Sequence, residues 1–179
     1  EVMKKVVLER NGNRELTPYL LFVIFVLGVK LAIIARYGNA TPFWDQWDGE
    51  ADGTYRPWLE GALHWTDLFT AHNEHRIFTA RLLALAIFEL NGRVWNPILQ
   101  MQVNAVIHTF AISLLLFYLS KALSSAYKTA LFIISAMLFA IPFGWENTLA
   151  GFQSPFYFLL LFSFIHLWAM SAYKTYSAR

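Results

Sequence analysis

The stretch ILQMQVNAVIHTFAISLLLFYL, residues 98–119, decides the fold class of this chain. It contains no charged residue, and it is longer than the roughly 20 residues that an α-helix needs to cross a hydrocarbon core of about 30 Å. Three other blocks, residues 18–36, 126–143 and 155–173, are similarly apolar. Together with a span over 98–120 they predict an all-α protein, a polytopic transmembrane helical bundle with four spans.

The composition agrees with a membrane protein and excludes other classes. Of the 179 residues, 57% are hydrophobic and only 15% are charged, whereas soluble domains carry roughly 25% charged residues. A net charge of +2 is too small to indicate a nucleic-acid partner. The absence of cysteine excludes disulfides and thiolate metal sites. We treat residues 1–179 as a single membrane domain and expect it to be the amino-terminal fragment of a longer protein.

The lysines predict how the spans are oriented. Residues 77–90 are apolar but short and contain two charges, which is typical of an interfacial or re-entrant helix. If this segment does not cross, Lys121 and Lys128 fall on the same side as both chain ends, as the positive-inside rule expects. We therefore predict that both ends are cytoplasmic, in a bacterial inner (plasma) membrane. The outer side then receives two loops, 37–97 and 144–154.

The first outer loop is rich in aromatic and acidic side chains. Aromatic residues of this kind favour the headgroup level, and we expect 54–65 to form a short helix on the membrane surface. Carboxylates packed beside aromatic rings should differ in pKa, which prepares one of them to act as a general base or cation ligand. The alternative is a solvated acidic loop. The segment FWDQWDGEAD, residues 43–52, supplies Asp45, Asp48, Glu50 and Asp52.

A second polar cluster is AHNEHR, residues 71–76. Imidazole and guanidinium groups can bind phosphate, and imidazoles with a carboxylate can bind a divalent cation. The alternative is a polar cap that begins the following helix, with Asn73 as its N-cap. The candidate ligand-binding residues are His72, Glu74, His75 and Arg76.

A third cluster is PFGWENTLAGFQ, residues 142–153, between the last two spans. Glu146 is the only acidic residue after Glu89, and an ionisable group at a membrane boundary is costly unless it is used. Asn147 and Gln153 are suited to a hydroxylated ligand. A plain polar turn is the alternative.

Polar residues also occur inside the spans. Gln100, Asn104 and His108 recur every four residues, so they share one helix face that should point to the bundle interior or a cavity. Hydrogen bonding between helices explains Gln100 and Asn104 equally well. Lys30 in the first span either meets a lipid phosphate or, more simply, snorkels to the surface.

These pieces in this order resemble the amino-terminal module of the C-type glycosyltransferase superfamily, polytopic enzymes that take a sugar from a polyprenyl-phosphate carrier. The resemblance runs from the first span to Gln153. Asp45 matches the acidic residue of the family's first outer loop, His72 stands nearest its His-Pro-Pro-Leu element, and Glu146 matches a later acidic residue. Gln46 follows Asp45 where the family often has a second acid, and the Pro-Pro is missing. The motifs also resemble those of uncharacterised bacterial membrane proteins placed near this superfamily.

The resemblance implies an enzyme, a glycosyltransferase of the cell envelope that transfers sugar from a polyprenyl-phosphate donor on the extracytoplasmic face. The implied partners are membrane lipid and that donor, and a divalent cation (Mg²⁺ or Mn²⁺), if bound, would use Asp45 and Glu146. The alternative is a non-enzymatic transporter or an assembly subunit of cell-envelope polysaccharide export. With the resemblance and the polar clusters taken together, we predict catalytic roles for Asp45, Glu146 and Asp48, and substrate binding by His72, Glu74, His75, Arg76, Asn147 and Gln153.

Overall fold

The computed structural model describes residues 2–177, and the side chains of residues 16–171 and 173. Four segments are long and apolar enough to cross a membrane: Leu16–Tyr37, Pro97–Ser120, Ser125–Thr148 and Gly151–Ser171. They belong to helices α1 (Val2–Tyr37), α4 (Pro97–Ser120), α5 (Ser125–Ala140) and α7 (Ser154–Ser177). The chain is an integral membrane protein with an all-α bundle, as the sequence predicted.

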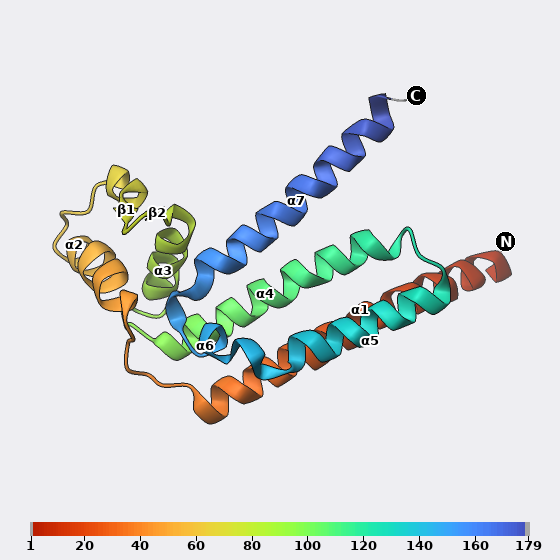
Figure 1. The fold of residues 1–179 in the computed structure, drawn as a ribbon, viewed down its shortest axis with the longest axis horizontal. Helices are drawn as coiled ribbons and strands as arrows, with labels where there is room; N and C mark the ends of the chain where they lie inside the picture. The colour runs from red at the N-terminus through yellow and green to blue at the C-terminus, as the bar shows by residue number, and fades with distance from the viewer. Residues whose placement is uncertain (1, 178–179) are drawn as a thin grey trace.

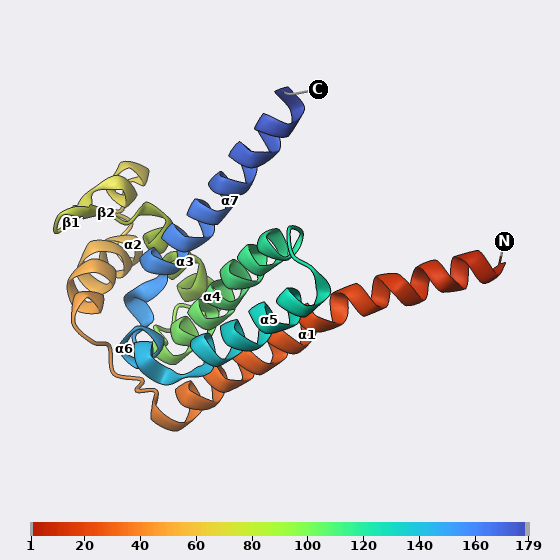
Figure 2. The same cartoon turned by 45° about the vertical axis from the view of Figure 1, so that its right-hand side comes forward.

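The ends of the four helices lie at two opposite ends of the bundle. The start of α1, the turn between α4 and α5, and the far end of α7 lie at one end, while residues 38–96 and the turn before α7 lie at the other (Figure 1). Helix α7 packs against α4 near its start and diverges from it toward its C-terminal end in both views (Figures 1 and 2). The two polar loops therefore share one end of the bundle, opposite both ends of the chain, in the arrangement that the lysines predicted.

The packed core lies between α1, α4 and α5. One cluster of buried side chains joins the three helices, and its members are Phe22, Val26, Ile112, Leu116 and Phe132. A second cluster, nearer the polar loops, contains Ile34, Met101 and Ala105 with Leu149 against it. Most other apolar side chains of α5 and α7 are exposed, which suits helices whose faces contact lipid.

The first polar loop folds into short elements. They are the π-helix η1 (Gln46–Tyr55), α2 (Arg56–Leu59), the 3₁₀ helix η2 (Trp65–Phe69), strands β1 (Ala71–His72) and β2 (His75–Arg76), and α3 (Phe78–Leu90). The expected bounds of the helix over 54–65 are wrong. Helical structure starts at Gln46 and ends at Leu59, and Gly61 just after it adopts a φ of +69°. Helix α3 has 13 residues, or about 20 Å, and is not among the segments long enough to cross a membrane, so its interfacial position stays a prediction.

The second polar loop begins earlier than predicted. Helix α5 ends at Ala140, and the chain continues as η3 (Pro142–Gly144), α6 (Trp145–Thr148) and η4 (Gly151–Gln153). The predicted span 126–143 is therefore too long as a continuous helix, because Pro142 has no N–H to extend the hydrogen-bond ladder.

Candidate functional site

The acidic loop is wound into a π-helix. The backbone N–H of Arg56 donates to the carbonyl of Ala51, and the Thr54 hydroxyl donates to the carbonyl of Gly49 at 3.0 Å, both five residues back. This wider winding turns Gln46, Glu50 and Thr54 inward, while Asp48 and Asp52 stay exposed. Such helices are rare and frequently mark functional sites.

Glu50 is a buried carboxylate that is surrounded by hydrogen-bond donors. It is 4% exposed, and it accepts hydrogen bonds from the side-chain amides of Gln46 (3.1 Å) and Gln100 (2.8 Å) and from the indole N–H of Trp95 (3.3 Å). Burial raises the pKa of Glu50, and these three hydrogen bonds oppose that rise. No described cation pairs with it, so the network alone compensates its charge.

The same network continues into the neighbouring helices. The side-chain amide of Gln46 donates to Gln100 Oε1 at 2.9 Å, and the side-chain amide of Gln100 donates to the Tyr55 hydroxyl at 3.1 Å. Tyr55 in turn donates to the backbone carbonyl of Ala84 at 3.4 Å. Burial and the charge of Glu50 raise the pKa of Tyr55, which keeps it protonated. Glu50 therefore fixes η1 against α3 and α4, and sequence reasoning did not single out its partners Gln46 and Tyr55.

Asp45 and His72 join two of the predicted clusters. The Asp45 carboxylate lies 3.8 Å from Nε2 of His72. The Asp45 side chain is 49% exposed and that of His72 only 13%, and within the described residues His72 Nε2 has no hydrogen-bond partner. The gap is too long for a direct hydrogen bond. An accessible carboxylate beside a buried imidazole is an arrangement used in general acid–base catalysis.

The local backbone explains how the pair is presented. His72 and His75 face each other in a two-residue hairpin, and Asn73 in its turn has a φ of +51°. The alternative in which Asn73 caps the following helix is wrong, because α3 begins at Phe78 with Ile77 as its N-cap. Trp44, directly before Asp45, has a φ of +50°, a left-handed conformation that costs a residue other than glycine about 1–3 kcal/mol. A strained or unusual residue thus adjoins each member of the pair.

A buried arginine holds the chain before the hairpin. Arg81 on α3 donates through Nη1 to the carbonyls of Asp67 (3.2 Å) and Thr70 (2.5 Å) and to the Thr70 hydroxyl (2.9 Å). Arg76 donates to the carbonyl of Phe69 at 3.0 Å. The hairpin is therefore anchored to η2 and α3 by guanidinium groups, which fixes the position of His72.

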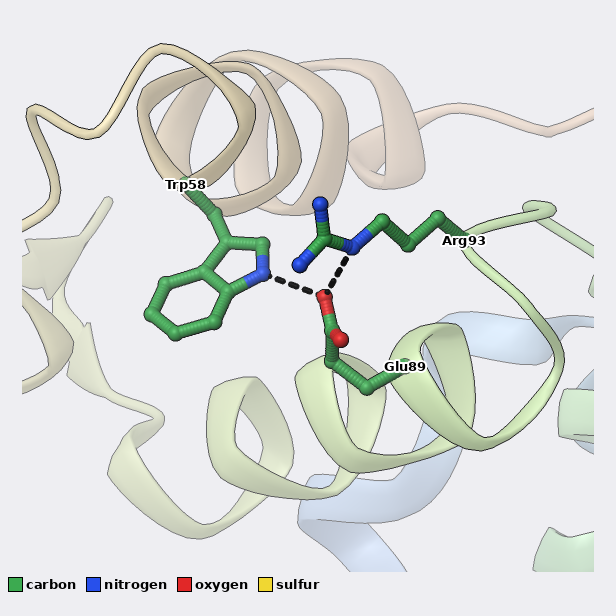
Figure 3. Close-up of polar contacts among 3 residues, drawn as sticks. All are labelled: Trp58, Glu89 and Arg93. Atoms are coloured by element: carbon green, nitrogen blue, oxygen red, sulfur yellow. Dashed lines mark hydrogen bonds and ion pairs between the residues drawn. The ribbon is translucent and has the colours of Figure 1, made fainter.

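A carboxylate on α3 holds helix α2. Trp58 on α2 donates its indole N–H to Glu89 Oε1 at 2.5 Å, and Arg93 Nε donates to the same oxygen at 2.9 Å (Figure 3). The hydrogen bond from Trp58 lowers the pKa of Glu89, and Arg93 lowers it further. This contact ties α2 to the end of α3.

Helix η4 of the second polar loop packs against His72 and the acidic loop. The rings of Phe152 and His72 lie 5.3 Å apart between centroids, and a Cβ at Gly49 would stand only 2.7 Å from Phe152. Asn104 donates to the carbonyl of Gly151 at 2.7 Å. The predicted face of α4 is confirmed as buried at Gln100 and Asn104. All three polar clusters thus meet around Asp45, His72 and Phe152.

No protein-family model, curated protein or solved structure matches this chain. Its function has to be inferred from the side chains that the fold brings together. The pair Asp45 and His72 is the best candidate, because Asp45 is accessible and His72 is held by the hairpin and by Phe152.

The other predicted site residues lie outside this contact. Glu146 is exposed on α6, and no hydrogen bond or ion pair joins it to Asp45 within the part of the chain that the structure describes. Gln153 is half-buried, with an Oε1 that lacks a partner. Among residues 2–177 as described, no three imidazole or carboxylate groups form a metal site, so a cation at Asp45 would depend on substrate and water ligands. The exposed candidates are Asp48, Glu74, His75, Arg76 and Asn147.

Proposed function

We propose that this chain is the amino-terminal module of a membrane glycosyltransferase that uses a polyprenyl-phosphate sugar on the extracytoplasmic face. One observation carries the proposal: the half-exposed Asp45 carboxylate lies 3.8 Å from the buried Nε2 of His72, 27 positions later (72 − 45), in the polar loop at the end of the bundle opposite both chain ends. A lipid-linked donor presents its phosphate at the membrane surface. Exposed rings beside the pair, such as Trp44 and Trp47, suit that depth.

In the proposed reaction a hydroxyl of the acceptor attacks the anomeric carbon of the donor sugar. The new carbon–oxygen bond forms as the bond to the carrier phosphate breaks, and polyprenyl phosphate leaves with the bonding electrons. Asp45 accepts the proton of the attacking hydroxyl. His72 positions the Asp45 carboxylate, because its ring is confined by Phe152 and by the hairpin.

The remaining polar residues of this end are proposed to bind the two substrates. His75 and Arg76 lie on the exposed strand of the hairpin and present cationic groups to the donor phosphate. Asp48 and Glu146 are proposed to contact the acceptor. The membrane in this proposal is the bacterial inner membrane, with both ends of the chain cytoplasmic.

The test is Asp45→Asn in the full-length protein, assayed in proteoliposomes with radiolabelled polyprenyl-phosphate sugars. General-base catalysis contributes roughly 10²–10⁴-fold, so we expect transfer to fall at least a hundredfold. His72→Gln should lower the rate less, and the double variant should be no slower than Asp45→Asn if the two act as a unit. Asp52→Asn is the control, because Asp52 is an exposed carboxylate in η1. Undiminished transfer by Asp45→Asn would remove Asp45 from the reaction.

A further inference from the structure

A cavity of about 410 Å³ lies inside the bundle, beneath the second polar loop. Helices α1, α4, α5, α6 and α7 all contribute to its wall. Its polar lining comes from Lys30, His108, Asn147, Thr148 and Tyr157, and the rest is largely apolar, including the exposed Phe143 and Phe156. Phe143 is 83% exposed. The cavity is therefore open at a rim of aromatic side chains that face lipid.

The backbone beside this cavity is irregular at membrane depth. Helix α5 has 16 residues, so it rises about 24 Å, short of the roughly 30 Å of a hydrocarbon core. Residues 141–144, which leave the α-helical winding and include the 3₁₀ turn η3, all line the cavity and complete the crossing. Irregular backbone is tolerated at this depth where it is covered by protein or lines a cavity, and broken helices of this kind often form binding sites.

Lys30 places a positive charge in this cavity. It is 7% exposed, so it is buried in the bundle instead of snorkelling to the surface as the sequence suggested. Within the described residues it has no hydrogen-bond or ion-pair partner, and no described carboxylate lines the cavity. A buried, unpaired ammonium costs several kcal/mol, which a bound anion would offset.

His108 supplies a second unsatisfied group. Its ring stacks on Tyr157 at 4.6 Å and meets Phe139 edge-on at 5.7 Å, so its orientation is fixed. Its Nδ1 atom is buried and has no hydrogen-bond partner among the described residues. A ligand with oxygen atoms beside Lys30 would find a second polar contact here.

We propose that this cavity binds the phosphate group of a membrane lipid. The Lys30 ammonium pairs with a phosphate oxygen, His108 hydrogen-bonds a second oxygen, and the lipid chain leaves past Phe143 and Phe156. Lys30 lies seven residues before the end of α1 at Tyr37, or about 10 Å along the helix. A lipid of the outer leaflet would therefore enter sideways with its phosphate drawn slightly inward. The proposal does not depend on the proposed transferase activity.

A larger cavity of about 1010 Å³ at the other end of the bundle is lined by lysines of a different kind. Its two lysines, Lys121 and Lys128, are exposed, and the Lys121 ammonium already lies 4.1 Å from the centre of the Phe117 ring. These lysines therefore provide a matched control, because they carry the same charge outside a buried, unpartnered setting.

The test measures lipid binding by the full-length protein in phosphatidylcholine nanodiscs with native mass spectrometry. Phosphatidylglycerol, polyprenyl phosphate and inorganic phosphate are titrated separately into wild type, Lys30→Met, Lys30→Arg and Lys128→Met. We expect Lys30→Met to weaken binding of a lipid phosphate at least about tenfold, equivalent to 1.4 kcal/mol, and Lys30→Arg to retain most of it. Lys30→Met should melt at the same or a higher temperature, because it removes a buried charge.

The outcomes separate the sources of the phosphate. Selective binding of phosphatidylglycerol assigns the cavity to a phospholipid, and selective binding of polyprenyl phosphate assigns it to the carrier. Inorganic phosphate binding as tightly as either lipid, with the same loss in Lys30→Met, would overturn the lipid assignment. Equal losses in Lys30→Met and Lys128→Met would also overturn it, because they would indicate general attraction to membrane charge. If the wild-type protein transferred sugar but bound none of the three phosphates, the cavity proposal would be overturned and the proposed function would stand.

Discussion

Replacing Gln100 with leucine tests whether the buried network around Glu50 holds the polar end together. Gln100 is 3% exposed, donates to Glu50 and Tyr55, and accepts from Gln46. Hydrogen bonds to charged groups contribute about 1.5–3 kcal/mol and neutral ones about 1. Breaking a buried charged contact by removing one partner typically costs about 3–5 kcal/mol. We therefore expect Gln100→Leu to lower the free energy of unfolding by about 3–5 kcal/mol.

The pH dependence of this loss identifies Glu50 as its cause. Burial already raises the pKa of Glu50 above 4.5, and removing the Gln100 donor raises it further. The folded variant then binds a proton that the unfolded chain releases, so its stability falls as pH rises from 4.5 through the raised pKa. The gap from wild type should be small near pH 4.5 and grow toward neutral pH.

The assay is thermal unfolding of the full-length protein in detergent, followed by tryptophan fluorescence across a pH series. Gln102→Leu is the matched control, because Gln102 is exposed on the same helix. Adding Glu50→Leu to Gln100→Leu should recover part of the loss, since no buried charge then remains. A Gln100→Leu protein as stable as Gln102→Leu, or a gap that narrows as pH rises, would refute the network's role.

Three further predictions concern other contacts of this end. Gly151→Ala should destabilise by about 1–3 kcal/mol, because its Cβ would stand 2.7 Å from Gln46 Nε2, whereas Gly144→Ala, with nothing within 4 Å, should not; chemical unfolding compares them. Glu89→Gln should lower the melting temperature above pH 4.5 and lose that effect as pH falls through the lowered pKa of Glu89; equal melting curves at neutral pH would count against the contact with Trp58. Trp44→Gly should leave stability within about 1 kcal/mol but reduce sugar transfer, since the backbone beside Asp45 is freed; unchanged transfer would contradict a role for this strain.

The spans and the polar face of α4 could be predicted from sequence because each depends on local periodicity. Crossing a membrane requires a long apolar helix, and a spacing of four places Gln100, Asn104 and His108 on one face whatever surrounds them. Burial at Gln100 and Asn104 confirmed that prediction. The orientation of the spans could likewise be predicted from the lysines, because this prediction needs only the rule that cationic loops share one side.

The division of labour among the carboxylates could not be predicted. Asp45 and Glu50 lie in the same acidic stretch, and composition cannot separate them. Glu50 is buried because Gln100, 50 positions later, supplies a donor. Asp45 directly precedes the π-helix as its N-cap and stays half-exposed, 3.8 Å from His72. The π-helix and the two-residue strands that hold His72 are too short to leave a periodic pattern, so tertiary contacts decide them.

The shared face of α4 also constrains how the two proposed sites relate. Gln100 contacts the η1 network and His108 lines the cavity, and the eight residues between them (108 − 100) span about 12 Å of helix. The anomeric carbon of a polyprenyl-phosphate sugar is bonded through one oxygen to its phosphorus. A phosphate held beside His108 would lie about 12 Å along α4 from the η1 network that adjoins Asp45, which is farther than this linkage reaches. The lipid in the cavity must be either a phospholipid or a carrier that is not positioned for transfer, and the reacting donor needs its own phosphate contacts on the hairpin, where His75 and Arg76 lie.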